Sequence, residues 1–479
     1  MTPAQASGLV HAPLADWAHS QGETIAISNG VDSLTFAQLH ADVERRAHAL
    51  SQQQAAATVL VDDSLPMVQR LVDFLGIVAS GRCAAVGDPD WLPAVQKTVK
   101  ESVPNVASEM PSPQPSTPFY VGYTSGSTGL PKGFRRDHRS WAESFRVCLQ
   151  DFGPDAGSRI LAPGRDSHSL FLFGMLLGIW TGAGVVVQER FSAAAALETL
   201  RQGLTPCMIA VPSQLILMID VAKHRHMAPI QEVRLILISG ARWMRNRTTE
   251  LRSLFPRARI VEFYGASETS FIAWMDTDAT TPAAVVGRPF SNVDIQIRQE
   301  LEEECAGLIY VRSPMLFMDY VGSENDDTIA LRDGDWLSVR DLGYLDDQGR
   351  LCLAGRQNRM IVTQGKNLFA EELEAVLQAH PAIAMASVHG VQDARRGSQV
   401  VALIQWASGV ADAYPDALQL SAWCRQRLES YKTPRKYFLC AHWAHTISGK
   451  TDHRRLAQTL RDHLDADLQT QAPCLTALH

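Results

Sequence analysis

Tyr123-Thr-Ser-Gly-Ser-Thr-Gly-Leu-Pro-Lys-Gly133 is the stretch on which the fold and the chemistry of this chain depend. It follows the apolar residues 119–122 and is rich in Gly, Ser and Thr, which predicts a loop that leaves a buried strand. Backbone amides, several hydroxyls and the ammonium of Lys132 would meet in such a loop, and these groups bind a polyphosphate. Lys132 lies between Pro131 and Gly133, so the order of a Walker loop is absent. The stretch alone would also fit a kinase or an ATPase.

The chain has 479 residues, more than one hydrophobic core usually serves, which predicts two or more domains. A net charge of -7 gives no electrostatic reason to expect nucleic acid or an anionic membrane as a partner. The basic pair Arg135-Arg136 is expected on a solvated face or beside an anion. The eight cysteines form no CxxC pair, so a reducing compartment and no structural metal are expected.

No membrane segment or signal peptide is expected. Residues 1–20 have neither a basic start nor a continuous apolar run. Residues 169–187 carry no charge but contain four glycines, which favours a buried helix and a short buried strand over a membrane span. A soluble, cytoplasmic protein is therefore expected.

Strands and helices alternate through the first part of the chain. A strand is expected at residues 24–28, followed by a helix near residues 34–50 with one apolar stripe, formed by Phe36, Leu39, Val43, Ala47 and Leu50. Strand, helix and strand recur between residues 58 and 86. Further strands end near Pro163, Pro212, Gly240 and Gly265. The alternation predicts parallel sheets covered by helices, with ligands at the carboxyl ends of the strands.

The pattern changes after residue 287. Short alternating runs there predict a more antiparallel, barrel-like piece, and from about residue 359 strands and helices followed by a polar end predict a small domain. The expected fold class is α/β with several domains. Residues 1–357 would form a large N-terminal domain with two parallel-type sheets and a β-barrel-like subdomain, and residues 358–479 a small α+β C-terminal domain.

Further clusters contain side chains suited to nucleotide chemistry, and these are Tyr264-Gly-Ala-Ser-Glu268, Asp341, Gly355-Arg356, the loop at Gly365, and Ser448-Gly-Lys450. An aromatic ring can stack on a base, and Glu268 can ligate Mg2+ through oxygen. Asp341 suits the two vicinal hydroxyls of a ribose. Each cluster alone has a common structural explanation, such as a turn cap, a surface hairpin or a solvated lysine.

Together with the opening stretch, the order and spacing of these clusters resemble the adenylate-forming superfamily of acyl-CoA synthetases, carrier-protein adenylation domains and luciferases. The resemblance runs from about residue 20 to about residue 460. It implies a large N-terminal domain that binds ATP and a carboxylic acid, and a small mobile C-terminal lid that swings between two half-reactions. Nothing in the chain favours the oxygenase chemistry of luciferases.

The resemblance assigns roles residue by residue. Lys450, Glu268 and Thr124 would be catalytic, and Glu268 would hold Mg2+. ATP would be bound by Thr124, Ser125, Gly126, Ser127, Thr128, Gly129, Lys132, Tyr264, Gly265, Ala266, Ser267, Asp341, Arg356 and Lys450. Asn358 would be the hinge of the lid, and the Gly365 loop would face the thiol in the second half-reaction.

Three positions depart from the family pattern. Ser267 stands where threonine is usual, which keeps the hydroxyl. Arg340 replaces the glycine that usually precedes the ribose-binding acid, and Asn358 replaces the usual Asp or Lys of the hinge. The region between the second strand and Tyr123 is also short for the family.

The acid pocket is expected between strand ends and is lined by His168, Phe171, Phe173, Ser239, Gly240, Ala241 and Tyr264. Amino-acid-activating relatives carry an Asp just after the position of His168, to pair with the α-amine. Ser169 stands there, which disfavours a free amino acid and favours an acyl or aryl acid. His168 would gate the pocket or simply pack, and at least one of the two phenylalanines is expected in the core.

The acceptor thiol is expected to be coenzyme A, since no carrier domain follows Lys450. The phosphopantetheine arm of a separate carrier protein is the alternative. A nucleotide-binding regulatory protein without turnover is a second alternative, supported by Arg340 and Asn358 and opposed by Lys132, Glu268, Asp341 and Lys450. The identity of the acid, the oligomeric state and the pathway stay open.

Overall fold

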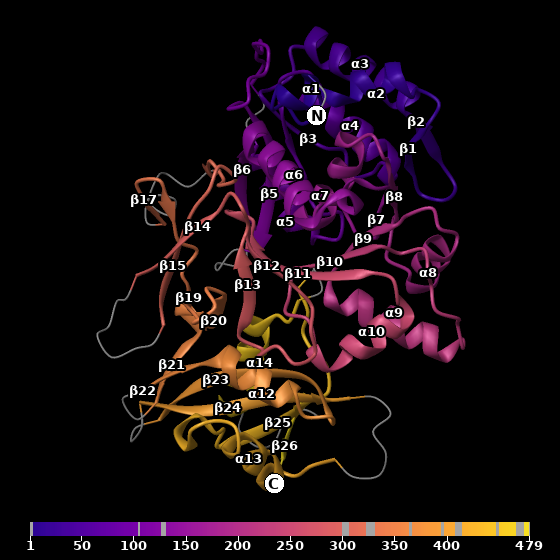
Figure 1. The fold of residues 1–479 in the computed structure, drawn as a ribbon. Helices are drawn as coiled ribbons and strands as arrows, with labels where there is room; N and C mark the ends of the chain where they lie inside the picture. Colours follow the sequence, from indigo (N-terminus) through magenta and orange to yellow (C-terminus); the bar gives the residue numbers. More distant parts are fainter. Residues whose placement is uncertain are drawn as a thin grey trace. The chain divides into compact units, whose positions relative to one another are not determined.

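The computed structural model describes residues 3–103, 106–125, 131–298, 306–321, 331–363, 366–393, 397–407, 414–446, 450–465 and 474–478 (Figure 1). The chain forms two compact units. The first comprises Met1–Thr280, Val286–Ile295 and Tyr310–Val339, and the second comprises Thr281–Val285, Gln296–Ile309 and Arg340–His479. A domain boundary after residue 357 stays a prediction.

The larger sheet of the first unit is parallel in its centre and antiparallel at its edges. In spatial order its strands are β13 (Val285–Pro289), β12 (Ser270–Asp276), β11 (Arg259–Ala266), β10 (Leu235–Ile238), β9 (Cys207–Ala210), β7 (Ile160–Ala162), β8 (Val185–Val187), β1 (Ile25–Ser28) and β2 (Ser33–Thr35). The strands from β11 to β1 pair in parallel. Their carboxyl ends therefore lie along one edge of the sheet, as the sequence predicts.

The second sheet of this unit contains the opening stretch. Its strands, in spatial order, are β16 (Asp319–Tyr320), β6 (Pro131–Asp137), β5 (Pro118–Ser125), β4 (Cys83–Ala85) and β3 (Thr58–Leu60). Strands β3, β4 and β5 are parallel, whereas β5, β6 and β16 are antiparallel. The predicted loop is thus the connection of a β-hairpin, and the strands take in more of the stretch than expected, from Tyr123 to Ser125 and again from Pro131.

Helices cover these sheets. They are α1 (Pro3–Ala6), α2 (Pro13–Ser20), α3 (Phe36–Gln52), α4 (Met67–Ala79), α5 (Pro93–Ser102), α6 (His138–Phe152), α7 (Ser169–Trp180), α8 (Ala193–Arg201), α9 (Pro212–His224) and α10 (Thr248–Leu254). Thr35 and Gln38 form a capping box that starts α3, and the whole predicted stripe of α3 is buried. Helix α7 and strand β8 confirm the helix and short strand expected in the charge-free segment. No helix in the described part of the chain has the length and apolar character needed to span a membrane.

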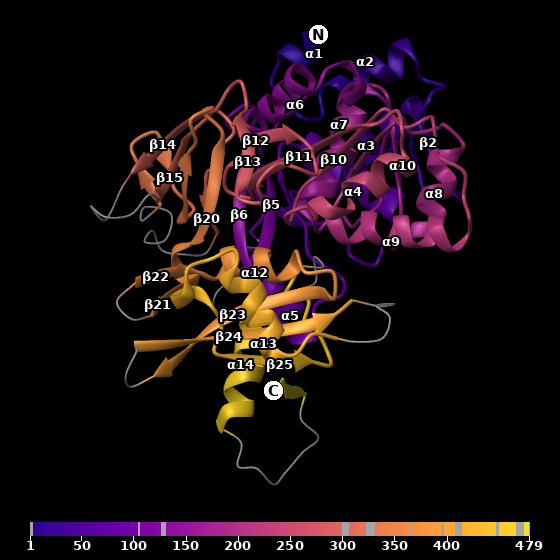
Figure 2. The same ribbon diagram turned by 60° about the horizontal axis from the view of Figure 1, so that its bottom comes forward.

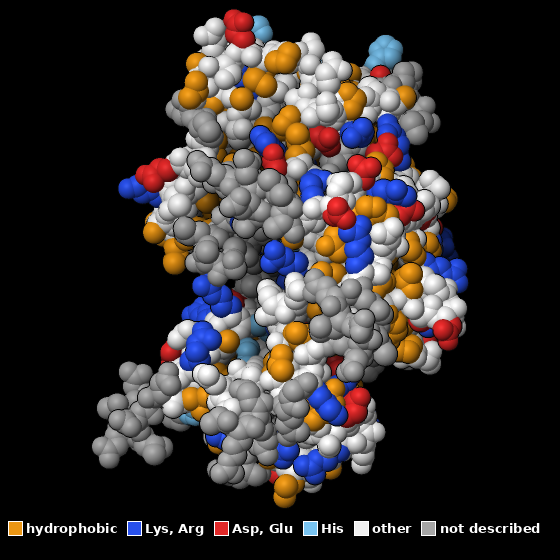
Figure 3. All heavy atoms as spheres, turned by 90° about the vertical axis from the view of Figure 1, so that its left-hand side faces the viewer, with side chains coloured by type: hydrophobic (Ala, Val, Ile, Leu, Met, Phe, Trp, Pro, Cys, Tyr) orange, Lys and Arg blue, Asp and Glu red, His pale blue; other side chains and the backbone are white. Residues whose placement is uncertain are grey.

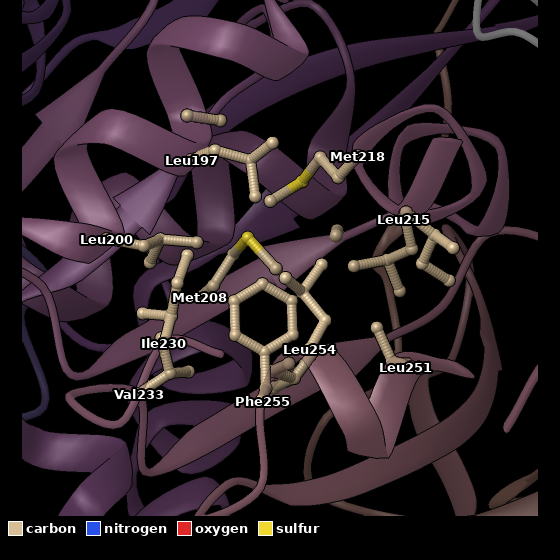
Figure 4. Packing of buried hydrophobic residues seen from close by; sticks show 14 of the residues in the cluster. Leu197, Leu200, Met208, Leu215, Met218, Ile230, Val233, Leu251, Leu254 and Phe255 are labelled. Carbon is tan, nitrogen blue, oxygen red and sulfur yellow. The ribbon is translucent and has the colours of Figure 1, made fainter. Parts of the chain in front are cut away.

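Helices α8, α9 and α10 bury one face of the larger sheet (Figure 1). Leucine and methionine side chains from these helices meet residues of the neighbouring strands, such as Met208 of β9, around Phe255 (Figure 4). Strand residues that would otherwise expose apolar surface are covered here, and burial of each large side chain stabilises the fold by about 1.5–3 kcal/mol. This core fixes the strands whose ends carry Ser239 and Tyr264.

The part after residue 287 is antiparallel, as expected. Its strands are β14 (Asp294–Arg298), β15 (Gly307–Arg312), β17 (Arg332–Asp333), β18 (Trp336–Leu337), β19 (Asp341–Leu345) and β20 (Leu351–Arg356). In the first unit β18 pairs antiparallel with β15 and β17, and in the second unit β19 pairs antiparallel with β20.

The second unit is built around the sheet β23-β24-β25-β26. After the hairpin of β21 (Met360–Thr363) and β22 (Lys366–Phe369), its elements are α12 (Ala370–Gln378), β23 (Ile383–Asp393), β24 (Gly397–Trp406), α13 (Ala417–Arg425), β25 (Lys436–Cys440), α14 (His453–Asp465) and β26 (Leu475–Leu478). Helices α12, α13 and α14 lie beside the strands of this sheet (Figure 2). Alternate residues of β24 pack against α12 and α13 on one face and against α14 on the other.

The expectation of a merely polar chain end is wrong. Helix α14 buries Leu456 and Leu460 against the sheet, and Leu475 of β26 joins the same cluster. The two leucines lie one helical turn apart among many charged residues, so the apolar stripe of this helix is weak in the sequence. Strand β26 pairs antiparallel with β25 and so covers an edge that would otherwise end the sheet.

Charged side chains of both signs are interspersed over much of the face drawn in Figure 3. This agrees with the modest net charge of -7.

Candidate functional site

The hairpin predicted to bind phosphate is described at both of its ends. Thr124 of β5 lies opposite Lys132 of β6, and the Thr124 hydroxyl donates a hydrogen bond of 3.4 Å to the Lys132 carbonyl. For Ser125 only the backbone is described. The pairing brings Thr124 and Lys132 together as predicted. Four residues of the predicted phosphate site lie outside the described residues, and these are Gly126, Ser127, Thr128 and Gly129.

A buried arginine connects this hairpin to the acidic turn after β11. Arg136 is 1% exposed. Its guanidinium donates to the Ser267 carbonyl at 2.7 Å, to the Met315 carbonyl at 2.6 Å and to the Ser270 hydroxyl at 2.5 Å. Burial lowers the pKa of Arg136 to about 10, which leaves it protonated at neutral pH. The expectation of a solvated or anion-binding pair is therefore wrong for Arg136, while the partly exposed Arg135 pairs with Asp319.

The Tyr264-to-Glu268 turn has a tightly specified backbone. A Cβ atom on Gly265 would lie 1.9 Å from the Ser270 carbonyl oxygen, so only glycine fits there. Ala266 and Thr269 exchange two hydrogen bonds, between the Ala266 amide and the Thr269 hydroxyl and between the Thr269 amide and the Ala266 carbonyl. The turn therefore places Tyr264 and Glu268 in fixed positions at the end of β11, where the sequence predicts them.

Glu268 is half-buried and oriented by a tyrosine. The Tyr320 hydroxyl donates a hydrogen bond of 2.7 Å to Glu268 Oε1, and the Phe317 amide donates to the Glu268 carbonyl at 2.8 Å. Lys132 Nζ lies 3.6 Å from the centre of the Tyr320 ring. Tyr320 could not be singled out from the sequence, because only the pairing of β16 with β6 brings it to Lys132 and Glu268.

The Glu268 carboxylate fits a ligand of Mg2+. A cation of this kind binds through one or two carboxylates and completes its shell with phosphate oxygens and water. The Tyr320 hydroxyl is the outer partner that such a carboxylate needs to hold its orientation. Within the described ranges, no group of three or more His, Cys, Asp and Glu side chains could hold a metal by itself.

The two residues expected at the ribose lie opposite each other in the second unit. Asp341 begins β19, Arg356 ends β20, and Arg356 Nε is 3.2 Å from Asp341 Oδ1. Arg340 has a φ of 63°. This left-handed conformation costs a residue with a Cβ about 1–2 kcal/mol, which explains physically why glycine is usual before the acid.

The residues expected to line the acid pocket come from two strand ends and the start of α7. Ser239 follows β10, and its hydroxyl donates 2.9 Å to the carbonyl of Phe263, the residue before Tyr264. Gly240 has a φ of 88°, and Ala241 is exposed. The structure thus brings residues 239–241 beside the strand that carries Tyr264.

At the start of α7, His168 is the N-cap and accepts a hydrogen bond from the Leu170 amide at 3.3 Å. The His168 and Phe171 rings are 5.3 Å apart. The Phe171 ring covers Gly164, where a Cβ atom would lie 2.1 Å from it. Phe173 instead packs in the core with Phe271, at 5.0 Å between ring centres.

The described carboxylate that lies nearest to Ser169 along the chain is not available to an amine. Asp166, three residues earlier, is 1% exposed, and its Oδ2 atom is 2.9 Å from Arg70 Nε. The Ser169 hydroxyl lies 3.3 Å from the Tyr120 hydroxyl. An acid that is buried and paired cannot take the place of the Asp found in amino-acid-activating relatives.

Lys450 lies at the end of a short hairpin in the second unit. The Thr446 amide donates to the Lys450 carbonyl at 2.7 Å, and the Lys450 amide donates to the Thr446 hydroxyl at 3.2 Å. The Trp443 indole donates to the Thr451 hydroxyl at 3.2 Å. These bonds fix the backbone at Lys450. Gly365 lies outside the described residues, and Asn358 lies in a single 3-10 turn, Gln357–Arg359.

A partly buried polar network follows directly after Lys450. The Ser387 hydroxyl lies 2.8 Å from both His389 Nε2 and His453 Nδ1, where His453 is the first residue of α14. His453 Nδ1 is also 3.6 Å from Glu374 Oε1, which accepts a hydrogen bond from the Val388 amide. The network anchors the start of α14 to β23, and sequence spacing gave no sign of it.

We expect acid to destabilise the second unit through these histidines. Burial, with a further contribution from the charge of Arg359, lowers the pKa of His389 to about 3 and that of His453 to about 2. The unfolded chain binds protons near pH 6.5, so stability is complete above that pH and is lost as the pH falls toward 3, by at most about 1.4 kcal/mol per pH unit for each histidine.

Urea titrations at about pH 7.5 and about pH 5, followed by hydrogen exchange of the β23 amides, measure this loss. A variant with His389→Gln and His453→Asn should lose part of the difference between the two pH values. An unchanged difference in that variant would contradict the assignment.

Two family profiles match the chain. Residues 52–321 match the profile described as AMP-binding enzyme, and residues 372–450 match that of the AMP-binding enzyme C-terminal domain.

Curated relatives include ligases of coenzyme A. The uncharacterized acyl-CoA ligase YhfT of Bacillus subtilis is 33% identical over 91% of this chain and 95% of that protein. The putative long chain fatty acid-CoA ligase VraA of Staphylococcus epidermidis is 29% identical over 71% of each chain. The 2-succinylbenzoate-CoA ligase of Arabidopsis thaliana is 30% identical over 66% of this chain and 62% of that protein.

Solved structures share the fold. The o-succinylbenzoate CoA synthetase MenE from Bacillus subtilis, in complex with its acyl-adenylate intermediate, has a TM-score of 0.79 at 22% identity and covers 96% of this chain and 99% of its own. ATP-bound MatB from Rhodopseudomonas palustris has a TM-score of 0.81 at 19% identity, with 95% and 99% covered. Another MenE structure contains ATP and a magnesium ion.

Proposed function

Because the chain belongs to the AMP-binding enzyme family and is an AMP-forming ligase, we propose that it activates an acyl or aryl carboxylic acid as acyl-AMP and then transfers the acyl group to coenzyme A. The membership confirms the resemblance seen in the ordered motifs. The substrate, the acceptor and the residue roles are proposed on the contacts described above and on the relatives.

One observation carries the proposal. In the first unit, Lys132 of the β5–β6 hairpin and Glu268 of the Tyr264-to-Glu268 turn contact the same side chain, Tyr320. The Lys132 ammonium lies over the Tyr320 ring, and the Glu268 carboxylate accepts a hydrogen bond from the Tyr320 hydroxyl. A cation for phosphates and a carboxylate for Mg2+ are the two groups that a magnesium triphosphate requires from a protein.

In the first half-reaction, a carboxylate oxygen of the acid attacks the α-phosphorus of ATP, and the bond from that phosphorus to pyrophosphate breaks. The acid is ionised at pH 7 and needs no general base. Two anions must approach each other, so the protein must supply positive charge. Lys450 takes this role at the carboxylate and the α-phosphate, and the Thr124 hairpin with Lys132 holds the pyrophosphate. Mg2+ held by Glu268 supplies further neutralisation of phosphate charge.

Tyr264 stacks on adenine, with Gly265, Ala266 and Ser267 along the same turn, while Asp341 and Arg356 bind the ribose. In the second half-reaction the lid turns at Asn358, which withdraws Lys450 and brings the Gly365 loop to the thiol. The sulfur bonds to the acyl carbon, the acyl-to-oxygen bond breaks, the thiol proton is lost, and AMP leaves.

The acid is acyl or aryl and carries no α-amine to be recognised. Support comes from Ser169, which stands where amino-acid-activating relatives carry an Asp, and from Asp166, whose carboxylate is paired with Arg70. Relatives named for a long chain fatty acid and for 2-succinylbenzoate agree with both acid types. Their names also favour coenzyme A over a carrier protein as acceptor.

Adenylate trapping tests the proposal. The full chain is incubated with ATP, Mg2+, hydroxylamine and single acids from a panel of fatty, aryl and amino acids. We expect hydroxamate and pyrophosphate with at least one fatty or aryl acid, and little with amino acids.

Addition of coenzyme A or of a holo carrier protein in place of hydroxylamine then identifies the acceptor, and thioester formation with coenzyme A is expected. A preference for glycine or alanine would overturn the reading of Ser169. If the carrier protein were loaded faster than coenzyme A, the carrier protein would be the acceptor. If no acid released pyrophosphate, a regulatory nucleotide-binding protein would be favoured.

A further inference from the structure

Tyr320 is held rigidly between the two parts of the ATP site. It pairs with Phe134 in the β16–β6 ladder, and the following residue, Val321, donates its amide to the Gly133 carbonyl at 2.8 Å. Its ring packs edge-on against the Phe317 ring, with 4.9 Å between the ring centres, and the Phe317 amide donates a hydrogen bond to the Glu268 carbonyl. The backbone and the ring plane of Tyr320 are therefore fixed from both sides.

Lys132 and Glu268 meet different parts of this one side chain. The ammonium of Lys132 lies 3.6 Å from the ring centre, which is the geometry of a cation–π contact. The Glu268 carboxylate accepts the phenol hydrogen at 2.7 Å, a charge-assisted hydrogen bond. One side chain thus contacts both a cation and an anion, which attract each other.

A direct ion pair between these groups would oppose ATP binding. The lysine would have to leave the carboxylate before it could meet a phosphate, and the carboxylate would lose its free charge for a cation. Both contacts to Tyr320 are weaker than the contacts that a phosphate or Mg2+ offers. A contact of this strength can be exchanged for a contact with the ligand, which is what a preorganised site requires.

Resting on the proposed function, we propose that Tyr320 is a positioning residue that holds Lys132 and Glu268 in place for a magnesium triphosphate. Its hydroxyl orients Glu268 toward the metal, and its ring holds the Lys132 ammonium for the phosphates. These two roles belong to separate atoms, so they can be removed separately.

Calorimetry of ATP binding to the full chain tests the proposal without turnover. The measured quantity is the magnesium gain, defined as the Kd in EDTA divided by the Kd in saturating Mg2+. Tyr320→Phe keeps the ring and removes the hydroxyl, and we expect the magnesium gain to fall about tenfold while the Kd in EDTA changes by less than about twofold. Tyr320→Leu should show the same fall and also raise the Kd in EDTA about threefold.

Tyr414→Phe is the matched control, because Tyr414 is exposed and stacks on Trp406 in the second unit. Its magnesium gain should equal that of the wild type. A Tyr320→Phe protein with the wild-type gain would overturn the proposal, and so would equal losses with and without Mg2+, which a merely structural role predicts. Tyr320→Phe carries the test even where Tyr320→Leu does not fold. A wild type that binds no ATP would instead refute the proposed function itself.

Discussion

Replacement of Lys450 by alanine is expected to lower the rate of acyl-AMP formation by about 10²–10³-fold, because the carboxylate and the α-phosphate then approach each other without a neutralising charge. Thioester formation from supplied acyl-AMP should stay within about threefold of the wild type, because the second half-reaction does not use Lys450. The backbone hydrogen bonds at Lys450 do not depend on its side chain, so the hairpin is expected to persist. Pyrophosphate release and thioester formation, measured separately on the full chain, give the two rates.

Lys436→Ala is the control, since Lys436 is an exposed lysine of the same unit. Both of its half-reactions should match the wild type. If Lys450→Ala lowered the rates of acyl-AMP formation and of thioester formation equally, the proposal that the lid withdraws Lys450 before the second half-reaction would be contradicted.

Arg136→Met is expected to lower the free energy of unfolding by about 3 kcal/mol. The substitution removes donors from the Ser267 and Met315 carbonyls and from the Ser270 hydroxyl, and each buried acceptor left without a partner costs about 1–3 kcal/mol. Relief of the buried charge offsets part of this loss. Urea unfolding of the full chain, followed by the exchange of amides in β6 and β11, measures the change.

The neighbouring Arg135→Met is the matched control. The Arg135 guanidinium pairs with Asp319 at a partly exposed position, and such pairs contribute at most about 1 kcal/mol. A similar loss in both variants would show that the buried contacts of Arg136 are not the cause.

Local patterns predicted the elements of this chain well. The stripe of α3 follows from the helical repeat, and its burial needs no knowledge of distant residues. The ordered motifs singled out Lys132, Glu268, Asp341 and Lys450 as candidate site residues, because each lies in a short stretch with a recognisable composition, and their roles stay predictions. Helix α14 was missed because its apolar side contributes only two leucines among charged residues.

Contacts between distant segments could not be predicted. The two carbonyl partners of Arg136 lie more than a hundred residues away along the chain, so a pair of arginines was assigned to the surface. Tyr320 carries no signal of its own, and it matters only because β16 pairs with β6. Arg340 shows the opposite case, because its departure from the family pattern was visible in the sequence and its left-handed backbone explains the usual glycine.

The central claim is that a carboxylate oxygen of the acid attacks the α-phosphorus of ATP. An acid that gives hydroxamate is labelled with oxygen-18 in its carboxylate and converted to the thioester with unlabelled ATP and coenzyme A, and the products are examined by mass spectrometry. We expect AMP that carries one labelled oxygen and pyrophosphate that carries none. Label in inorganic phosphate, with ADP as the nucleotide product, would contradict it.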